Sequence, residues 1–263
     1  MDFSVLVGFA LLALPPLVLW VIFWRKRLAE PEPTKVLAQL FLFGILASLP
    51  LFALREINFS FPSWALLILF AWLEESLKGL ALIFGVEFNR ARFDKWEDGF
   101  EFAIMIALGF AFAENIFYFL RQYLDSGISL NFWQIYLFRS LGTVLGHIIF
   151  TGTFGYFYAC AYVKKGLVPF SKHEKPLAHF CKNIFKILRR PLHITLYHLL
   201  PQRDSALGHS SGEVIIEGFL LAIILHTLFN ALLHFEILDQ SFAFLAVPIL
   251  LGGGVWYFYR FKQ

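Results

Sequence analysis

The chain has 263 residues, of which 59% are hydrophobic and only 16% are charged, and its mean hydropathy is +0.67. A soluble domain is typically about 45–50% apolar and about 25% charged. With 33 phenylalanines and a net charge of only +3, the composition excludes an ordinary soluble enzyme and a nucleic-acid-binding protein. Two cysteines make no disulfide framework of the kind that small secreted domains use. The sequence therefore predicts one all-α integral membrane domain over residues 1–263, in contact with the lipid bilayer on its outer face.

Seven segments are apolar over the roughly 20 residues that a helix needs to cross a bilayer. Taken in chain order, these predicted membrane spans are 3–24, 36–54, 62–86, 99–120, 140–163, 213–234 and 239–259.

Lysine and arginine are distributed unequally between the two sets of predicted loops. Loops 25–35, 87–98 and 164–212 carry four, three and nine of them, and the C-terminal tail carries two. The loops on the other side of the membrane hold only Arg55, Arg121 and Arg139. Because basic loops stay in the cytoplasm, we predict that the N-terminus lies outside, that the C-terminus lies inside, and that the long loop is cytoplasmic. That loop fits either a basic helix lying on the inner leaflet or a solvated segment.

Six ionisable side chains fall well inside the predicted spans, where a central charge costs about 2.5–3.5 kcal/mol on insertion scales. They are Glu74, Glu75, Lys78, Glu114, His147 and His226. At 1.5 Å per residue, the glutamates of the third span lie about 18 Å below its outer end, and the groups on the later spans lie about 9–12 Å below theirs. Four helices therefore bring polar groups into the outer half of the bilayer, which indicates a common polar site.

Further polar residues lie one helical turn from these groups and share their helix faces. They are Lys78 after Glu74 and Glu75, Thr151 after His147 and Asn230 after His226, while Asn115 directly follows Glu114. We expect Lys78 to keep one of the two adjacent carboxylates ionised, and the others to support the site.

Carboxylates and histidines around a membrane-buried cavity can hydrolyse a peptide bond. A glutamate acts as general base on a water molecule, and a histidine assists the proton transfer. An asparagine and a second histidine can stabilise the oxyanion that forms. We assign the base to Glu74, with Glu75 second, and the oxyanion to His226 and Asn230.

A metal-dependent version of the same site is an alternative. Zinc sites of catalytic proteins have three protein ligands and one open position, and Glu74, His147 and His226 are the candidate ligands. We favour the metal-free mechanism, since the carboxylates outnumber the histidines and the sequence has no compact ligand motif.

Two sequence motifs resemble those of the PrsW family of intramembrane proteases. Glu74-Glu75-Ser76-Leu77-Lys78 resembles the family's Glu-Glu-x-x-Lys motif, and Gly109 to Asn115 resembles its Gly-Phe-Ala-x-x-Glu-Asn segment. His147 with Thr151 and His226 with Asn230 also match in order and spacing, so the resemblance covers about residues 62–234.

The resemblance implies a helical bundle around a Glu/His site in the plasma membrane. It also implies proteolysis of membrane-tethered proteins, notably anti-sigma factors. The family is related to the CAAX prenyl proteases and bacteriocin-processing membrane proteins, which are described as glutamic proteases. That branch has a histidine where this sequence has Glu114, so Glu114 and His147 both remain candidates for the second water-activating group.

A proton-coupled transporter or a non-proteolytic membrane scaffold is the alternative function, because the same acids and histidines can relay protons. Transporters often consist of two related halves. The sequence has no visible internal repeat, which favours the protease.

Overall fold

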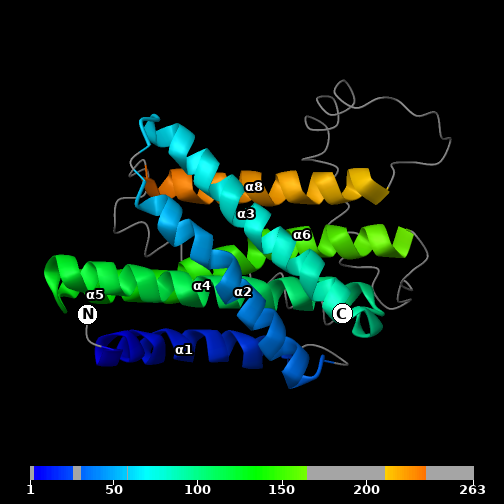
Figure 1. Cartoon of the computed structure of the whole chain (residues 1–263), viewed down its shortest axis with the longest axis horizontal. Helices are drawn as coiled ribbons and strands as arrows, with labels where there is room; N and C mark the ends of the chain where they lie inside the picture. The colour runs from blue at the N-terminus through cyan, green and yellow to red at the C-terminus, as the bar shows by residue number, and fades with distance from the viewer. Residues whose placement is uncertain (1–2, 26–30, 58, 165–210, 235–263) are drawn as a thin grey trace.

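The structure is a computed structural model that describes residues 3–25, 31–57, 59–164 and 211–234 (Figure 1). Every regular element in these residues is helical, which confirms the predicted all-α class. The long helices are α1 (Phe3–Arg25), α2 (Thr34–Arg55), α3 (Ser63–Phe88), α4 (Trp96–Ser126), α5 (Leu130–Phe138), α6 (Val144–Lys164) and α8 (Ser211–His234). Two short elements join them, the 3-10 turn η1 (Arg90–Arg92) and the π-helical turn η2 (Arg139–Thr143).

Five stretches of the described residues are long and apolar enough to cross a membrane. They are Ser4–Ile22, Thr34–Arg55, Glu97–Ser126, Leu130–Tyr162 and Ser211–Leu233. The chain is therefore a multi-pass membrane protein. Helix α3 has sufficient length, 26 residues, but carries three charged residues in its middle and is not among the five. The predicted seventh span at 239–259 and the loop 164–212 lie outside the described residues, so the count of seven and the orientation stay predictions.

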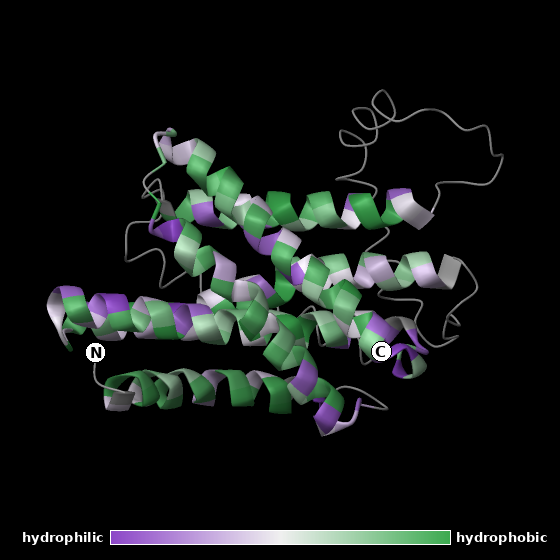
Figure 2. Cartoon of the chain, in the orientation of Figure 1, coloured by the Kyte–Doolittle hydropathy of each residue, from purple (hydrophilic) through white to green (hydrophobic). Residues whose placement is uncertain are grey.

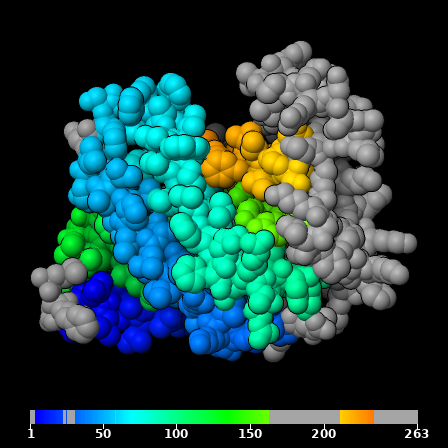
Figure 3. Space-filling view, turned by 45° about the vertical axis from the view of Figure 1, so that its right-hand side comes forward, coloured from blue at the N-terminus to red at the C-terminus, as the bar shows by residue number. Residues whose placement is uncertain are grey.

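The helices form two layers (Figure 1). Helices α1, α4, α6 and α8 run side by side in that order, and each packs against the next. Helices α2 and α3 cross this layer obliquely; α2 packs on α4, and α3 contacts α4, α6 and α8. A second view shows α3 next to both α2 and α8 (Figure 3). Helix α3 thus lies over the middle of the layer, where it reaches three other helices.

Glycines let the two layers approach closely. A methyl group at Gly109 of α4 would collide with the backbone of Phe41 on α2, and one at Gly44 with the backbone of α4. Between α4 and α6, Gly99 and Gly155 face each other in the same way. Such small residues are typical of helix pairs in membranes, where backbones pack closely.

The helices are hydrophobic along most of their length, with hydrophilic residues at helix ends and in the middle of α3 (Figure 2). Many of the outward apolar side chains are exposed, as expected for a surface that faces lipid. The hydrophilic middle of α3, by contrast, is buried against the other layer.

The segment 121–139, predicted as a loop, is mostly helical. Helix α4 continues to Ser126 and ends at Gly127, whose φ of +64° suits glycine. Helix α5 then begins after Ser129, whose hydroxyl accepts a hydrogen bond from the backbone of Phe132. The buried ring of Phe132 packs with Phe9 of α1 and Phe119 of α4. This aromatic packing holds α5 against the bundle.

Candidate active site

The six ionisable residues predicted to share a site do lie together, in the centre of the bundle. All are at most 4% exposed. Glu74, Glu75 and Lys78 come from α3, which presents this face to the layer beneath it. Glu114, His147 and His226 come from α4, α6 and α8.

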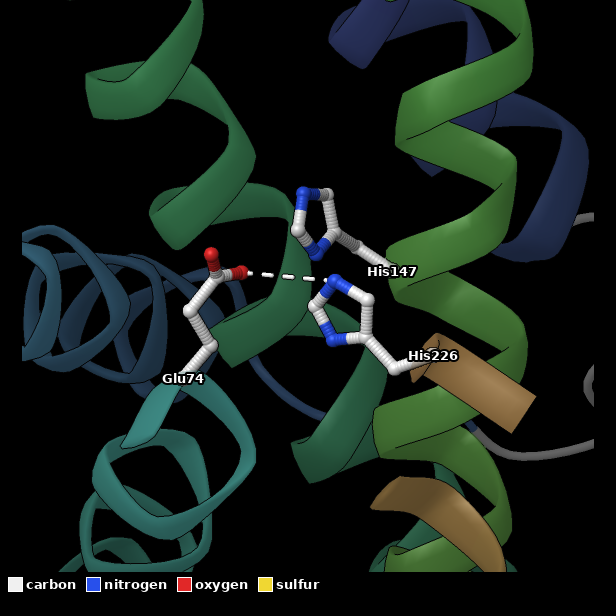
Figure 4. Close-up of side chains that lie close together, drawn as sticks. All are labelled: Glu74, His147 and His226. Atoms are coloured by element: carbon white, nitrogen blue, oxygen red, sulfur yellow. Dashed lines mark ion pairs between the residues drawn. The ribbon is translucent and has the colours of Figure 1, made fainter. Parts of the chain in front are cut away.

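Glu74, His147 and His226 point toward one another (Figure 4). Each offers one ligand atom, and these three atoms lie within 4.8 Å of one another. Glu74 Oε2 is 3.5 Å from His226 Nε2 and has no hydrogen-bond partner, although it is buried. The Lys78 ammonium lies 3.9 Å from the same oxygen, too far for a hydrogen bond. A buried oxygen without a hydrogen bond is costly, so this atom faces the place where a water molecule or a cation would be expected.

Glu75 orients the ring of His226. Its Oε1 lies 2.8 Å from His226 Nδ1 and 2.6 Å from Lys78 Nζ, and its Oε2 accepts from the Thr151 hydroxyl at 3.1 Å. A carboxylate can only accept, so the proton of a neutral His226 ring resides on Nδ1. The lone pair of Nε2 is then directed at Glu74.

Glu114 orients the ring of His147 in the same manner. His147 Nε2 is 3.0 Å from Glu114 Oε2, and His147 Nδ1 is 3.0 Å from Lys78 Nζ. Because an ammonium group can only donate, Nδ1 is the acceptor, and the ring proton resides on Nε2. The Lys78 ammonium also lies 4.4 Å from the centre of the Phe110 ring, a favourable cation–π contact.

Two arginines that the sequence did not predict for this site complete the cluster. Arg55, at the end of α2, donates to Glu74 Oε1 at 2.8 Å and to Glu114 Oε1 at 2.7 Å. Arg139, in η2, donates to Glu114 Oε2 at 2.9 Å and to the side-chain oxygen of Asn115 at 3.0 Å. Both oxygens of Glu114 are therefore occupied, which favours an orienting role for it over that of a base.

The π-helical turn places Arg139. Such turns insert one extra residue into a helix and are frequent at functional sites. Here η2 joins α5 to α6 and turns Arg139 toward α4, so that its guanidinium lies 3.7 Å from the centre of the Tyr118 ring.

A pocket of about 580 Å³ leads to this cluster from one end of the bundle. That end contains the C-terminal end of α2 and the N-terminal end of α3, and sequence analysis predicts that it is extracytoplasmic. The apolar part of the wall includes five phenylalanines, at positions 59, 70, 138, 150 and 229. The polar part contains Glu74, Glu114, His147, His226, Asn230 and the three arginines Arg55, Arg121 and Arg139. Asn230 thus faces the pocket, as its spacing from His226 predicted.

The residues present fit a divalent metal ion. One carboxylate oxygen and two imidazole nitrogens form a ligand set that occurs in catalytic zinc sites. Each histidine also has a carboxylate on its other nitrogen, Glu75 for His226 and Glu114 for His147. Such outer carboxylates are typical of metal-binding histidines, and the unpaired Glu74 Oε2 adds the third ligand atom.

The fold and this site together define a class, a multi-pass helical membrane protein with a buried Glu/His centre reached by a pocket. Residues 32–176 match the family described as "PrsW family intramembrane metalloprotease". Because this match covers more than half of the chain, the protein belongs to that family. The matched region contains the motifs of α3, α4 and α6 and ends before His226 and Asn230 of α8.

Curated relatives carry the same family name. The chain is 28% identical to protease PrsW of Geobacillus kaustophilus over 152 residues, which are 56% of this chain and 63% of the relative. It is 27% identical to protease PrsW of Shouchella clausii, over 55% of this chain and 69% of the relative. It is 26% identical to protease PrsW of Bacillus subtilis, over 50% of this chain and 62% of the relative. The match thus spans less than two thirds of the first of these relatives, and no solved structure matches the chain.

Proposed function

We propose that the protein is an intramembrane peptidase of the plasma membrane that hydrolyses a peptide bond in membrane-tethered proteins. Anti-sigma factors are the substrate class that the sequence motifs suggest. The observation that carries the proposal is the pocket that ends at an unpaired Glu74 oxygen between two oriented histidines. A substrate segment entering this pocket would meet three groups able to hold and activate one water molecule.

In the metal-dependent form, Glu74 Oε2, His147 Nδ1 and His226 Nε2 would hold the ion. The ion would then replace the hydrogen bond that His147 Nδ1 accepts from Lys78 in this structure. When bound, zinc supplies Lewis-acid polarisation of the substrate carbonyl and lowers the pKa of a bound water. The paired outer carboxylates of both histidines support this form over the metal-free one that the sequence alone favoured. In the metal-free form, Glu74 is the general base, because it is the carboxylate with a free oxygen facing the histidines.

The remaining groups keep the reactive atoms in place. Glu75 and Thr151 fix His226, while Glu114 fixes His147. Lys78 offsets the charge of Glu75, since both side chains are buried and their charged atoms lie 2.6 Å apart. Groups that are held before the substrate arrives need no reorganisation during the reaction.

The test uses the purified full-length protein in lipid nanodiscs with a single-span reporter protein, with and without a chelator. The wild type should cleave the reporter, and Glu74→Gln should lower the rate by about 10²–10⁴-fold, since the amide keeps the shape but loses the basic oxygen. Chelation that abolishes cleavage, with recovery on adding zinc, supports the metal-dependent form; insensitivity to chelation supports the metal-free form. Full activity of both Glu74→Gln and Glu75→Gln would contradict the proposed function.

A further inference from the structure

Arg55 is the cation of the pocket wall that touches the reactive carboxylate. Its guanidinium reaches from the end of α2 over the pocket to α3 and α4. Nη2 donates to Glu74 and Glu114, and Nη1 donates to the hydroxyl of Tyr118 at 2.9 Å. The side chain is only 15% exposed, and the Tyr118 and Phe70 rings lie 5.2 and 5.8 Å from it.

The Arg55 guanidinium has N–H groups that are not used by its present partners. An arginine carries five N–H groups, and three of them serve Glu74, Glu114 and Tyr118. Among the described residues, the other two N–H groups have no hydrogen-bond partner, and the side chain lines the pocket. Arg55 can therefore accept a new oxygen without giving up the contacts that hold it.

Peptide hydrolysis needs a donor for the oxygen of the scissile carbonyl, which becomes negative in the transition state. His226 is poorly suited, because its Nδ1–H is directed at Glu75 and its Nε2 faces Glu74. Asn230 also lines the pocket, and its neutral amide can donate one hydrogen bond to the same oxygen. Arg55 keeps its charge at any working pH, and a fixed cation counts for more in a buried site than in water.

We propose that Arg55 is a catalytic residue that donates hydrogen bonds to the oxyanion of the tetrahedral intermediate. The inference rests on the proposed peptidase function and extends it. A water held by Glu74 lies about 3 Å from the carbonyl carbon it attacks. Arg55 Nη2 lies 2.8 Å from Glu74 Oε1, so the guanidinium borders the carboxylate whose other oxygen, Oε2, holds the water. The carbonyl oxygen would meet the two N–H groups that Arg55 does not use, one on Nε and one on Nη1.

The reaction balances without a proton from Arg55. In the metal-free form, the water oxygen bonds to the carbonyl carbon, a proton passes to Glu74, and the carbonyl electron pair moves onto the oxygen that Arg55 contacts. When the oxyanion collapses, the C–N bond breaks, and the proton passes from Glu74 to the leaving amine. Arg55 retains all its protons throughout.

A purely structural role for Arg55 is the competing explanation, because Arg55 also neutralises Glu74 and Glu114. Arg139 provides the matched control, since it too is a nearly buried cation, 12% exposed, that contacts Glu114 and lines the pocket. Its hydrogen bonds to described residues go to Glu114 and Asn115 and not to Glu74.

The experiment compares Arg55→Met, Arg55→Lys and Arg139→Met in nanodiscs with the same reporter. For each variant, kcat, KM, the melting temperature and the bound zinc are measured. The affinity for a phosphinic peptide, which mimics the tetrahedral intermediate, is measured beside that of the uncleaved peptide. We expect Arg55→Met to lower kcat by about 10²–10³-fold with little change in KM. The affinity of Arg55→Met for the phosphinic peptide should fall by the same factor as kcat/KM, while its affinity for the uncleaved peptide should stay unchanged.

Arg55→Lys should recover part of the rate, because it restores the charge but not the planar fork. Arg139→Met should lower kcat far less than Arg55→Met. The inference is overturned if Arg55→Met keeps the wild-type kcat, or if Arg55→Met binds the phosphinic and the uncleaved peptide more weakly by the same factor. It is also overturned if the fall in kcat is accompanied by a fall in melting temperature or in bound zinc, and Arg139→Met shows the same falls. A wild type that never cleaves the reporter overturns the proposed function itself, which is a distinct result.

Discussion

Each of the two central histidines is held at one ring nitrogen by a carboxylate, and this arrangement predicts the effect of removing one. Glu75→Gln keeps an acceptor for His226 but removes the charge that fixes its tautomer. Loss of such an outer carboxylate typically costs 10–100-fold in metal affinity or activity. We expect a drop of about that size, smaller than that of Glu74→Gln, measured as kcat/KM and as bound zinc.

Thr151→Val serves as the control for this change, since it removes only the neutral hydrogen bond to Glu75 Oε2. Its effect on the rate should be the smaller of the two. A Glu75→Gln variant as active as Thr151→Val would contradict the orienting role of Glu75.

A second prediction concerns Glu32, which precedes α2. Burial raises the pKa of its carboxyl above the ordinary value, with Arg92 and Lys95 acting in the opposite direction and Asp94 reinforcing it. One carboxyl oxygen is buried without a hydrogen-bond partner, and the Glu32 backbone N–H donates to Glu101. The folded protein therefore binds the proton more tightly than the unfolded chain does. Stability is greatest below the ordinary carboxyl pKa and falls as the pH rises through the raised one.

Glu32→Gln removes the charge that destabilises the folded protein when the Glu32 carboxyl is ionised. We expect a higher melting temperature than wild type at neutral pH, and a difference that shrinks when the pH is lowered to about 4, near the ordinary glutamate pKa. Glu87→Gln is the control, because Glu87 is exposed and pairs only loosely with Arg90. A Glu32→Gln variant that melts below wild type at pH 7 would refute the prediction.

The site could be predicted to a large extent because charges inside apolar spans are expensive. That cost pointed to all six central residues, and helical spacing added Thr151 and Asn230. Arg55, Tyr118 and Arg139 were missed, because polar residues at helix ends meet water or headgroups at little cost. One signal was available: Arg55 and Arg139 are two of the three basic residues on the side of the membrane that is otherwise poor in them.

At the level of the helices, the crossing of α2 and α4 predicts how much an added methyl group destabilises the protein. Gly109→Ala should destabilise the protein by about 1–3 kcal/mol, the usual cost of overpacking, because its methyl group would meet the backbone of Phe41. Gly8 of α1 is the matched control, since nothing lies within 4 Å of a methyl group there. Gly8→Ala should be stabilising by about 0.5–1 kcal/mol, as alanine is in a helix interior.

Thermal unfolding of both variants in the same detergent would measure the difference. Equal melting temperatures for the two variants would show that α2 and α4 do not cross at these glycines.

Hydrophobicity predicted the positions of six of the long helices closely, but it could not predict how α4, α5 and α6 connect. Helix α4 extends to Trp96 at its start, where the Asp98 carboxylate accepts hydrogen bonds from the backbone of Asp94 and Lys95. At its end, α5 and the π-helical turn depend on aromatic contacts with α1 and α4. The start of α4 is thus set by a local cap, whereas α5 depends on contacts between distant segments rather than on local propensity.

For the whole molecule, the orientation in the membrane is the outstanding prediction. The pocket opens at the end of the bundle that the positive-inside rule places outside. Ile128→Cys and Arg90→Cys, both at exposed positions at opposite ends of α4, would be compared in a background without Cys160 and Cys181. A membrane-impermeant maleimide should label Ile128→Cys in intact cells, and Arg90→Cys only after permeabilisation. The reverse result would place the pocket on the cytoplasmic side.

The charged middle of α3 also has a consequence for biogenesis. Its two carboxylates and one ammonium make spontaneous partition from the translocon into lipid unfavourable, at about 2.5–3.5 kcal/mol for each charge. Arg55 of α2 is made first, but the bond from Glu75 to His226 spans 151 residues of sequence. At about 5–20 residues per second, the ribosome needs roughly 8–30 s to make that length. During this interval we expect α3 to stay with the insertion machinery or with α2, until α8 is made and His226 can bond to Glu75.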